Sequence, residues 1–343
     1  MKFGPVPVAE AEGAIVAHTI RQDSLILKKG QTVTREHMEK LAAAGIAEII
    51  AARLDAEDVG EDEAARLLAE KLAGPHIRLE RAFTGRVNLF AEAAGLLVVD
   101  AGAIDRLNGV DEAITVATLP RYHVVAPGDM AATVKIIPFA ARRAALDAGL
   151  AGAERGAVAV APFRPLRVGV VSTLLPGLKP SVVAKTLRIL EERLAPAAAR
   201  IEREERTPHD AAALAQALDR VAPDSDLVIV FGASAITDRR DVIPAAIENR
   251  GGRIDHFGMP VDPGNLLLLG ELAGRPVIGA PGCARSPKEN GFDWVLQRLL
   301  AGVPVGSKDI RAMGVGGLLM EIPQRPQPRL GERGAANPPD QAR

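Results

Sequence analysis

The chain has 343 residues, enough for two domains, and its 48% hydrophobic and 25% charged residues are ordinary for a globular protein. A formal net charge of -1 and an aromatic content of 3% argue against a nucleic-acid surface, which needs excess positive charge and stacking side chains. A single cysteine, Cys283, excludes an intramolecular disulfide, and six scattered histidines disfavour a structural zinc site.

The first region, residues 1–150, predicts a mixed α+β arrangement. Residues 25–54 give a strand, a helix that begins after the N-cap Thr34, and a second strand. Residues 60–74 predict an amphipathic helix, because their leucines gather on one helical face. Residues 111–139 are β-rich, with a Pro-Gly turn between strands.

The Ala- and Gly-rich sequence that follows predicts a linker at residues 151–164. From 165 to 322, apolar strands alternate with amphipathic helices, as at the strand 226–231, and a hairpin is expected at 266–281. This alternation predicts an α/β three-layer sandwich with a mostly parallel sheet covered on both faces. Residues 323–343 are Pro-rich and polar, and we expect a disordered tail there.

The most informative stretch is DLVIVFGASAITDRRDVIPAAI, residues 226–247, where a buried strand opens into a turn of small residues. Gly232 and Ala233 would let a ligand approach the backbone closely, and Ser234 offers a hydroxyl. Asp241 precedes a helix, and a helix N-terminus favours anions. A tight turn in which Asp241 is only an N-cap explains the same residues.

Three further loops follow predicted strands, at residues 172–181, 258–272 and 279–291. The carboxyl ends of parallel strands meet at one edge of a sheet, so we expect all four loops to lie together. The last loop carries two cations and a hydroxyl before a helix, which would suit a phosphate. The candidate binding residues in the three loops are Thr173, Pro263, Gly264, Asn265, Pro281, Gly282, Arg285, Ser286 and Lys288. Ordinary solvated loops are the alternative interpretation.

The order of these loops resembles the molybdenum cofactor biosynthesis domain shared by molybdopterin molybdenumtransferases and molybdopterin adenylyltransferases. The resemblance covers roughly residues 165–322 and is carried by RVGVVST, by the stretch at 226–247, by GMPVDPGN and by PVIGAPGCARSP. Residues 27–54 also resemble the segment that precedes this domain in the molybdenumtransferases. Taken whole, the chain looks most like a molybdopterin-binding module that some bacteria fuse to a nucleotidyltransferase-like domain.

The resemblance implies a molybdopterin ligand, which is a pterin with a dithiolene and a phosphate, often together with Mg²⁺. It carries over Gly232, Ser234, Asp241 and Thr173 position by position, and it matches Pro281 with Gly282 to the Pro-Gly of the late loop. In this reading Ser234 and Asp241 are the catalytic candidates. Asp241 would also bind Mg²⁺ or orient the pterin, and the cations of the late loop would hold its phosphate.

The sequence departs from the family pattern at several of these loops. Ala233 replaces a glycine, Asn265 replaces a lysine and Cys283 replaces an asparagine, while Leu174 and Leu175 stand where the first loop of the family has Gly and acids. Mg²⁺ prefers oxygen ligands such as carboxylates, so the departures favour pterin binding over molybdate insertion.

Three functions are therefore open at this stage. The first is molybdopterin binding in molybdenum cofactor biosynthesis, as a molybdenumtransferase-like or adenylyltransferase-like enzyme or as a carrier. The second is a catalytically degenerate scaffold or regulatory module, and the third is a nucleotide-acting enzyme on the same domain. The resemblance implies a homo-oligomer and a nucleotidyltransferase-like partner. No secretory signal and no apolar run of about 18 residues is found, so a cytoplasmic protein without membrane contact is expected.

Overall fold

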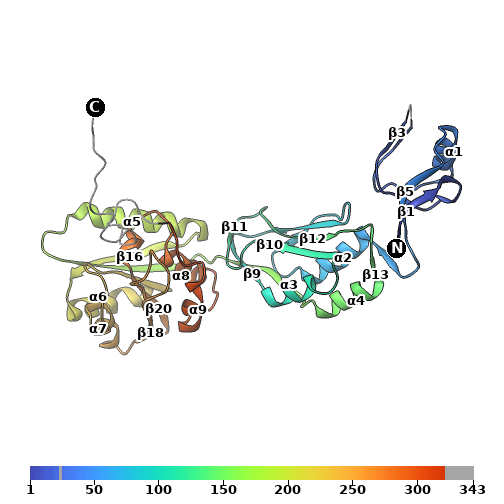
Figure 1. The fold of residues 1–343 in the computed structure, drawn as a ribbon. Coiled ribbons are helices and arrows are strands. Elements are labelled where there is room, and N and C mark those ends of the chain that lie inside the picture. The colour runs from blue at the N-terminus through green and yellow to red at the C-terminus, as the bar shows by residue number, and fades with distance from the viewer. Residues whose placement is uncertain (23–24, 321–343) are drawn as a thin grey trace, which may run out of the picture. The chain divides into compact units, whose positions relative to one another are not determined.

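The computed structural model describes residues 1–22 and 25–320. The chain divides into two compact units, Met1–Pro162 and a second unit that begins at Phe163 (Figure 1). The tail predicted at 323–343 lies outside the described residues. Among the described residues, none of the helices combines the length and the apolar character needed to cross a membrane.

The N-terminal part of the first unit is a small antiparallel arrangement with its own core. A three-stranded sheet has the order β1-β5-β2, and Leu41 of the helix packs in the core beneath it. Thr34 caps the helix as predicted, since its hydroxyl accepts a hydrogen bond from the His37 N–H. The elements are β1 (Lys2–Pro7), β2 (Ile15–Val16), β3 (Ile20–Gln22), β4 (Leu25–Leu27), α1 (Arg35–Ala43) and β5 (Glu48–Arg53).

The rest of the first unit encloses a second, larger core. Leu68 and Leu72 of the predicted amphipathic helix are fully buried in it, against two antiparallel sheets ordered β10-β12-β8-β7 and β11-β9-β14. The expected mixed α+β region is thus confirmed. Its elements are β6 (Asp58–Gly60), α2 (Glu61–Leu72), β7 (Ile77–Leu79), β8 (Arg86–Ala91), β9 (Gly95–Val99), α3 (Ala101–Asn108), β10 (Ile114–Thr118), β11 (Val124–Val125), β12 (Met130–Ile136), β13 (Ala140–Arg142), α4 (Arg143–Gly152) and β14 (Val158–Pro162).

The segment 151–164 differs from the predicted linker. Its residues Val158–Pro162 form β14, which pairs antiparallel with β9, and Val158 and Val160 are buried. The division between the units falls after Pro162. The sequence did not predict this strand, because it is a short run of Ala and Val whose partner lies far back in the chain.

The second unit is built on a six-stranded sheet with the order β16-β15-β17-β20-β19-β18. β15, β16, β17 and β20 pair in parallel, whereas β19 pairs antiparallel with both β20 and β18, so the sheet is mostly parallel as predicted. The elements are β15 (Arg167–Leu174), α5 (Pro180–Leu194), β16 (Arg200–Pro208), α6 (Ala211–Val221), β17 (Leu227–Phe231), α7 (Val242–Glu248), β18 (Arg253–Phe257), β19 (Leu268–Leu272), β20 (Arg275–Ala280), α8 (Gly291–Leu300) and α9 (Ser307–Arg311).

Successive side chains of the central strands pack on opposite faces of the sheet, and helices cover both faces, which gives three layers (Figure 1). Val170 and Ile229 pack in the core beneath α5 and α8, while Val171 and Val230 pack in the core beneath α6 and α7. Successive residues of a strand point to opposite faces, so continuous apolar strands require helices on both faces. The predicted three-layer α/β sandwich is confirmed.

One edge of this sheet is formed by β16, which pairs only with β15 among the described strands. Its residues 200–206 include three arginines and three glutamates, and they form ion pairs along the strand and with α6. The pairs are Arg200–Glu202, Arg203–Glu205, Arg206–Glu204 and Arg220–Glu205.

The four candidate loops lie at the same edge of the sheet. β15, β17 and β20 run in parallel, so the segments that follow them share the carboxyl edge. The turn between β18 and β19 joins them, because Leu268 at the start of β19 pairs with both Gly279 near the end of β20 and Phe257 at the end of β18. The predicted meeting of the loops therefore follows from the strand order.

Gly169 allows β15 to approach the helix layer closely. A Cβ atom at this position would clash with Ser225 Oγ and Val221 Cγ1, and both residues are buried. Only a glycine lets this part of the central strand pass so near the end of α6.

We expect Gly169→Ala to lower the free energy of unfolding of the second unit by about 1–3 kcal/mol, because an added methyl overpacks a filled core. Urea unfolding followed by the fluorescence of Trp294, the single tryptophan, reports on this unit. The matched control is Gly314→Ala, whose Cβ would make ordinary contacts of 3.5 Å and 3.6 Å with Pro260. Equal unfolding midpoints for the two variants would contradict the packing argument.

Candidate functional site

A small pocket of about 60 Å³ opens at the carboxyl ends of β15 and β17, against the first turns of α5. It brings together three of the residues predicted from the sequence: Thr173, Ala233 and Arg285. The complete lining is Ser172, Thr173, Leu178, Val182, Val183, Thr186, Phe231, Ala233 and Arg285. Pockets for whole small-molecule ligands begin at about 300 Å³, so this one holds only part of such a ligand.

Thr173 joins the ends of three strands. Its hydroxyl oxygen accepts a hydrogen bond of 2.8 Å from the Ala233 N–H, after β17, and lies 2.9 Å from Nδ1 of His209, after β16. The residue is fully buried. These contacts hold the turn after β17 in place against β15.

Arg285 connects the loop after β20 with the turn after β17. Its Nη2 donates a hydrogen bond of 2.8 Å to the Gly232 carbonyl, and its guanidinium lies 5.6 Å from the centre of the Phe231 ring. The cation predicted from the sequence is therefore at the pocket, held by a carbonyl and an aromatic face.

Gly232 sits at the point where the turn folds back on itself. A Cβ there would come within 2.8 Å of the Ser234 carbonyl oxygen and 3.0 Å of Ile243, so the position requires glycine. Ser234 itself is exposed and does not line the pocket. The structure thus places Gly232 beneath the turn and the Ser234 residue on its solvent side.

Asp241 is the N-cap of α7 in the structure. One carboxylate oxygen accepts from the Val242 N–H at 2.8 Å and the other accepts from the Thr237 N–H at 3.1 Å. Both oxygens therefore shape the loop 232–241. Across the described ranges, 1–22 and 25–320, no three His, Cys, Asp or Glu residues gather where they could hold a metal ion. The carboxylate that the sequence suggested for Mg²⁺ is thus already engaged by two backbone N–H groups.

The remaining predicted residues shape the other two loops. Asn265 donates to the Met259 carbonyl at 3.3 Å, and the Pro263 carbonyl accepts from the Gly291 N–H that begins α8. Gly264 packs against this same N–H, where a Cβ would lie within 2.8 Å. The turn 263–265 thus supports helix α8 and is not part of the pocket lining.

In the loop after β20, Pro281 is buried and Gly282 opens a short 3-10 helix, Gly282–Arg285. Ser286 is buried, and its hydroxyl accepts from the Lys288 N–H at 3.2 Å. The Lys288 side chain is exposed and is absent from the pocket lining. Of the three residues predicted to hold a phosphate, only Arg285 therefore reaches the pocket.

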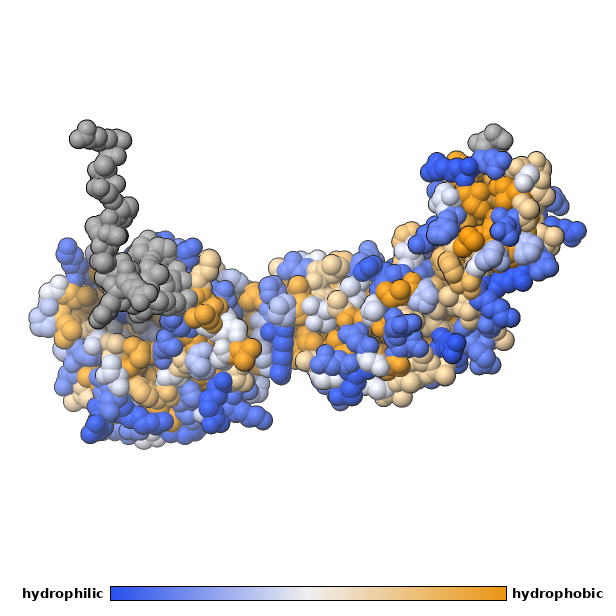
Figure 2. All heavy atoms as spheres, in the orientation of Figure 1, coloured by the Kyte–Doolittle hydropathy of each residue, from blue (hydrophilic) through white to orange (hydrophobic). Residues whose placement is uncertain are grey.

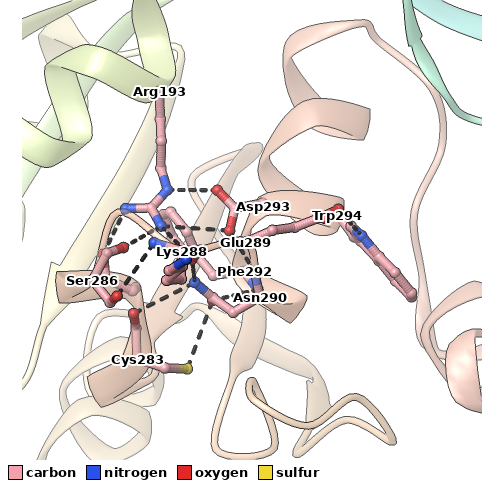
Figure 3. Close-up of polar contacts among 10 residues, drawn as sticks. Arg193, Cys283, Ser286, Lys288, Glu289, Asn290, Phe292, Asp293 and Trp294 are labelled. Atoms are coloured by element: carbon pink, nitrogen blue, oxygen red, sulfur yellow. Dashed lines mark hydrogen bonds and ion pairs between the residues drawn. The ribbon is translucent and has the colours of Figure 1, made fainter. Parts of the chain in front are cut away.

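A buried ion pair that the sequence analysis missed organises this late loop (Figure 3). Arg193 of α5 donates to Asp293 of α8 at 2.5 Å, and their side chains are only 11% and 9% exposed. The same guanidinium donates to the carbonyls of Ala284 and Ser286, each at 2.7 Å. Buried Asn290 donates to the Lys288 carbonyl at 2.9 Å, while its own N–H donates to Asp293.

One sequence signal could have found part of this cluster. Asn290 followed three residues later by Asp293, just before an apolar run, is a capping-box pattern, and the structure has that box. Nothing in the local sequence marks Arg193, since its partners lie about a hundred residues further along the chain. His209 was missed as well, although it directly follows a strand at the site edge.

His256 at the end of β18 lies on the same sheet edge. Its Nδ1 is 2.9 Å from the Ser307 hydroxyl oxygen. Burial lowers the pKa of His256, and the nearby Arg311 and Arg239 lower it further. Both effects favour the neutral ring, and His256 is not among the residues that line the pocket.

A larger open groove of about 530 Å³ lies in the N-terminal part of the first unit. Its walls are mostly apolar, and hydrophobic side chains also gather on the visible surface of this part (Figure 2). The groove contains none of the predicted site residues. Its lining is Val8, Ala9, Met38, Glu39, Ala42, Gly45, Ile46 and Ala47.

Comparison with known proteins gives a distant likeness. Residues 5–53 match a domain of unknown function (DUF8806), and no curated protein matches the sequence. A molybdopterin biosynthesis MoeA protein from Pyrococcus horikoshii is 15% identical with a TM-score of 0.31, over 88% of this chain and 75% of that one. The molybdopterin biosynthesis enzyme MoaB from Thermus thermophilus is 16% identical with a TM-score of 0.29, over 40% of this chain and 98% of that one.

A molybdenum cofactor biosynthesis protein from Pyrococcus furiosus is also similar, at 11% identity and a TM-score of 0.27, over 88% of this chain and 64% of that one. The chain therefore bears a distant structural resemblance to molybdopterin biosynthesis proteins.

The capping role of Asp241 predicts how its variants behave. We expect Asp241→Ala to destabilise the second unit by about 0.5–2 kcal/mol, because two backbone N–H groups lose their acceptor. Asp241→Asn keeps one acceptor and should lose less. Addition of Mg²⁺ should leave the unfolding midpoint of the wild type unchanged, measured by Trp294 fluorescence in urea. A midpoint that rises with Mg²⁺ in the wild type but not in Asp241→Asn would contradict the capping assignment.

We expect Arg193→Met to destabilise the second unit by about 3–5 kcal/mol, because Asp293 is left buried without its cation. Arg188→Met is the matched control on the same helix, since its ion pair with Glu192 is exposed and should matter little. Urea unfolding of the full chain, followed by Trp294 fluorescence, measures both. A loss in Arg193→Met no larger than in the control would show that the pair does not hold the loop.

Proposed function

We propose that the second unit binds a phosphorylated pterin of the molybdopterin type at the carboxyl ends of β15, β17 and β20. One observation carries the proposal: Thr173, Ala233 and Arg285, which come from three loops resembling this family, line a single pocket. A ligand at this edge of a mostly parallel sheet also agrees with the general position of binding sites in α/β proteins.

The surroundings of the pocket suit an amphiphilic ligand. Leu178 and Val182 line it and are 37% and 39% exposed, and Leu175 on the same loop is 48% exposed. Apolar side chains that stay exposed beside a polar pocket are typical of binding surfaces. A flat ring would rest on these side chains, with its polar substituent directed toward the pocket.

The residues in and around the pocket have separate parts in this proposal. Thr173 holds the turn by accepting the Ala233 N–H, Gly232 permits its tight fold, and Arg285 supplies positive charge. In this proposal Ser234, which is exposed on the outer side of the turn, would contact the ring portion of a ligand that extends beyond the pocket.

The geometry favours binding over catalysis by this chain. Asp241, the acid that precedes helix α7 after this turn, already accepts two backbone N–H groups. The pocket walls, as described, include no carboxylate. A carrier or scaffold in molybdenum cofactor biosynthesis, working with a nucleotidyltransferase-like partner or as a homo-oligomer, is the form of the function we propose.

A matched pair of variants on one turn tests the proposal. We expect Ala233→Leu to weaken molybdopterin retention by the full chain at least tenfold, because the larger side chain fills the pocket. Ala235→Leu makes the same change at an exposed position of that turn and should retain the ligand. Retention is measured by pterin fluorescence of the protein fraction after anaerobic gel filtration, and Trp294 unfolding verifies that both variants are folded.

Absence of retained pterin on the wild-type protein would refute the proposal and leave a scaffold without a pterin ligand as the function. Equal retention by the two leucine variants would move the site away from the pocket.

A further inference from the structure

We infer that the pocket between β15 and α5 is a subsite for a tetrahedral oxyanion, the phosphate end of the ligand, held by Ser172 and Arg285. The inference rests on the proposed function for the identity of the rest of the ligand. It goes beyond that proposal by assigning the group that enters the pocket and by adding Ser172, which the sequence resemblance did not single out as a contact.

Ser172 is the first argument. Its side chain lines the pocket, the residue is only 3% exposed, and its hydroxyl has no hydrogen-bond partner in the structure. Buried hydroxyl groups are nearly always paired, because an unpaired one loses its hydration without compensation. Every second residue of β15 faces the same side, and the two before Ser172 on that side, Val168 and Val170, are core residues. A hydroxyl at the next position, at the strand end, is what a polar ligand group would need.

Arg285 is the second argument. It lines the same pocket from the opposite loop, and its guanidinium is fixed by the Gly232 carbonyl and the Phe231 ring. A guanidinium carries five N–H donors in a planar fork that matches phosphate oxygens. The described pocket walls add hydroxyls and apolar groups but no carboxylate, so the charge of the pocket is positive.

The volume of the pocket limits which part of a ligand can enter it. About 60 Å³ is more than the 10–15 Å³ or so that one water needs, and far less than the roughly 300 Å³ of pockets for whole ligands. A compact group of a few heavy atoms fits, while a fused pterin ring does not. With one cation and the unpaired Ser172 hydroxyl in the described walls, an oxyanion is the compact group that both donors favour.

The site is also prearranged. The carbonyls of Ala284 and Ser286, on either side of Arg285, accept hydrogen bonds from buried Arg193. The turn that supplies the Gly232 carbonyl is held by Thr173. Donors that are fixed before the ligand arrives lose little conformational entropy on binding.

The experiment uses the full chain with inorganic phosphate as the probe. The unfolding midpoint is followed by Trp294 fluorescence as sodium phosphate replaces sodium chloride at constant ionic strength. A ligand that binds only the folded state raises the midpoint in a saturable way. We expect saturation for the wild type, and half-saturation at about tenfold higher phosphate for Ser172→Ala, the effect of one hydrogen bond to a charged group.

Two arginine variants test whether the effect of phosphate depends on the pocket. Arg285→Gln should abolish the saturable rise, whereas Arg188→Gln, which removes an exposed cation from α5, should leave it intact. Ser172→Ala without phosphate should be at least as stable as the wild type, because it removes an unpaired buried hydroxyl. A clear loss of stability there would instead mark Ser172 as structural and overturn the inference.

The outcomes separate this inference from the proposed function. No saturable effect of phosphate on the wild type, or an unchanged half-saturation in Ser172→Ala, refutes the subsite even if molybdopterin is retained. A Ser172-dependent phosphate effect without molybdopterin retention supports the subsite and refutes the pterin. If molybdopterin is retained, Ser172→Ala should weaken its retention by the same factor as it weakens phosphate.

Discussion

The path of the loop that follows strand β20 depends on one buried ion pair, between Arg193 and Asp293. Burial of two charges is costly unless each finds further hydrogen bonds. Here the guanidinium also binds two loop carbonyls, and the carboxylate also accepts the N–H of Asn290. The pair therefore fixes the path of the loop to two helices on one face of the sheet. The position of Arg285, which lies between the two bound carbonyls, follows from this constraint.

Two phenylalanines connect this buried ion pair with the central sheet. The rings of Phe231 and Phe292 lie 6.4 Å apart, with Arg285 over the first at 5.6 Å and Arg193 over the second at 5.7 Å. The electron-rich faces of the rings stabilise both cations where water is largely excluded. The pocket thus acquires its positive charge from a side chain supported by the core rather than by solvent.

The sequence predicted the three layers of the second unit and the edge of the sheet at which the loops meet. Both follow from local signals, namely the spacing of apolar residues in strands and helices and the Gly and Pro residues at turns. It also predicted Thr173 and Arg285 at a common site. It missed strand β14 and the Arg193–Asp293 pair, since both depend on partners distant in the chain. It also could not tell that Lys288 is exposed while Arg285, three residues earlier, lines the pocket. The two cations have the same character in the sequence, and only the 3-10 helix Gly282–Arg285 gives their side chains different directions.

The charged edge strand β16 has a consequence for assembly. Its arginines and glutamates already pair with one another and with α6. Another strand that docked there would place its own side chains beside this row of charges, which disfavours extension of the sheet at this edge. Copies of this protein that associate are therefore expected to leave the β16 edge of the sheet unpaired.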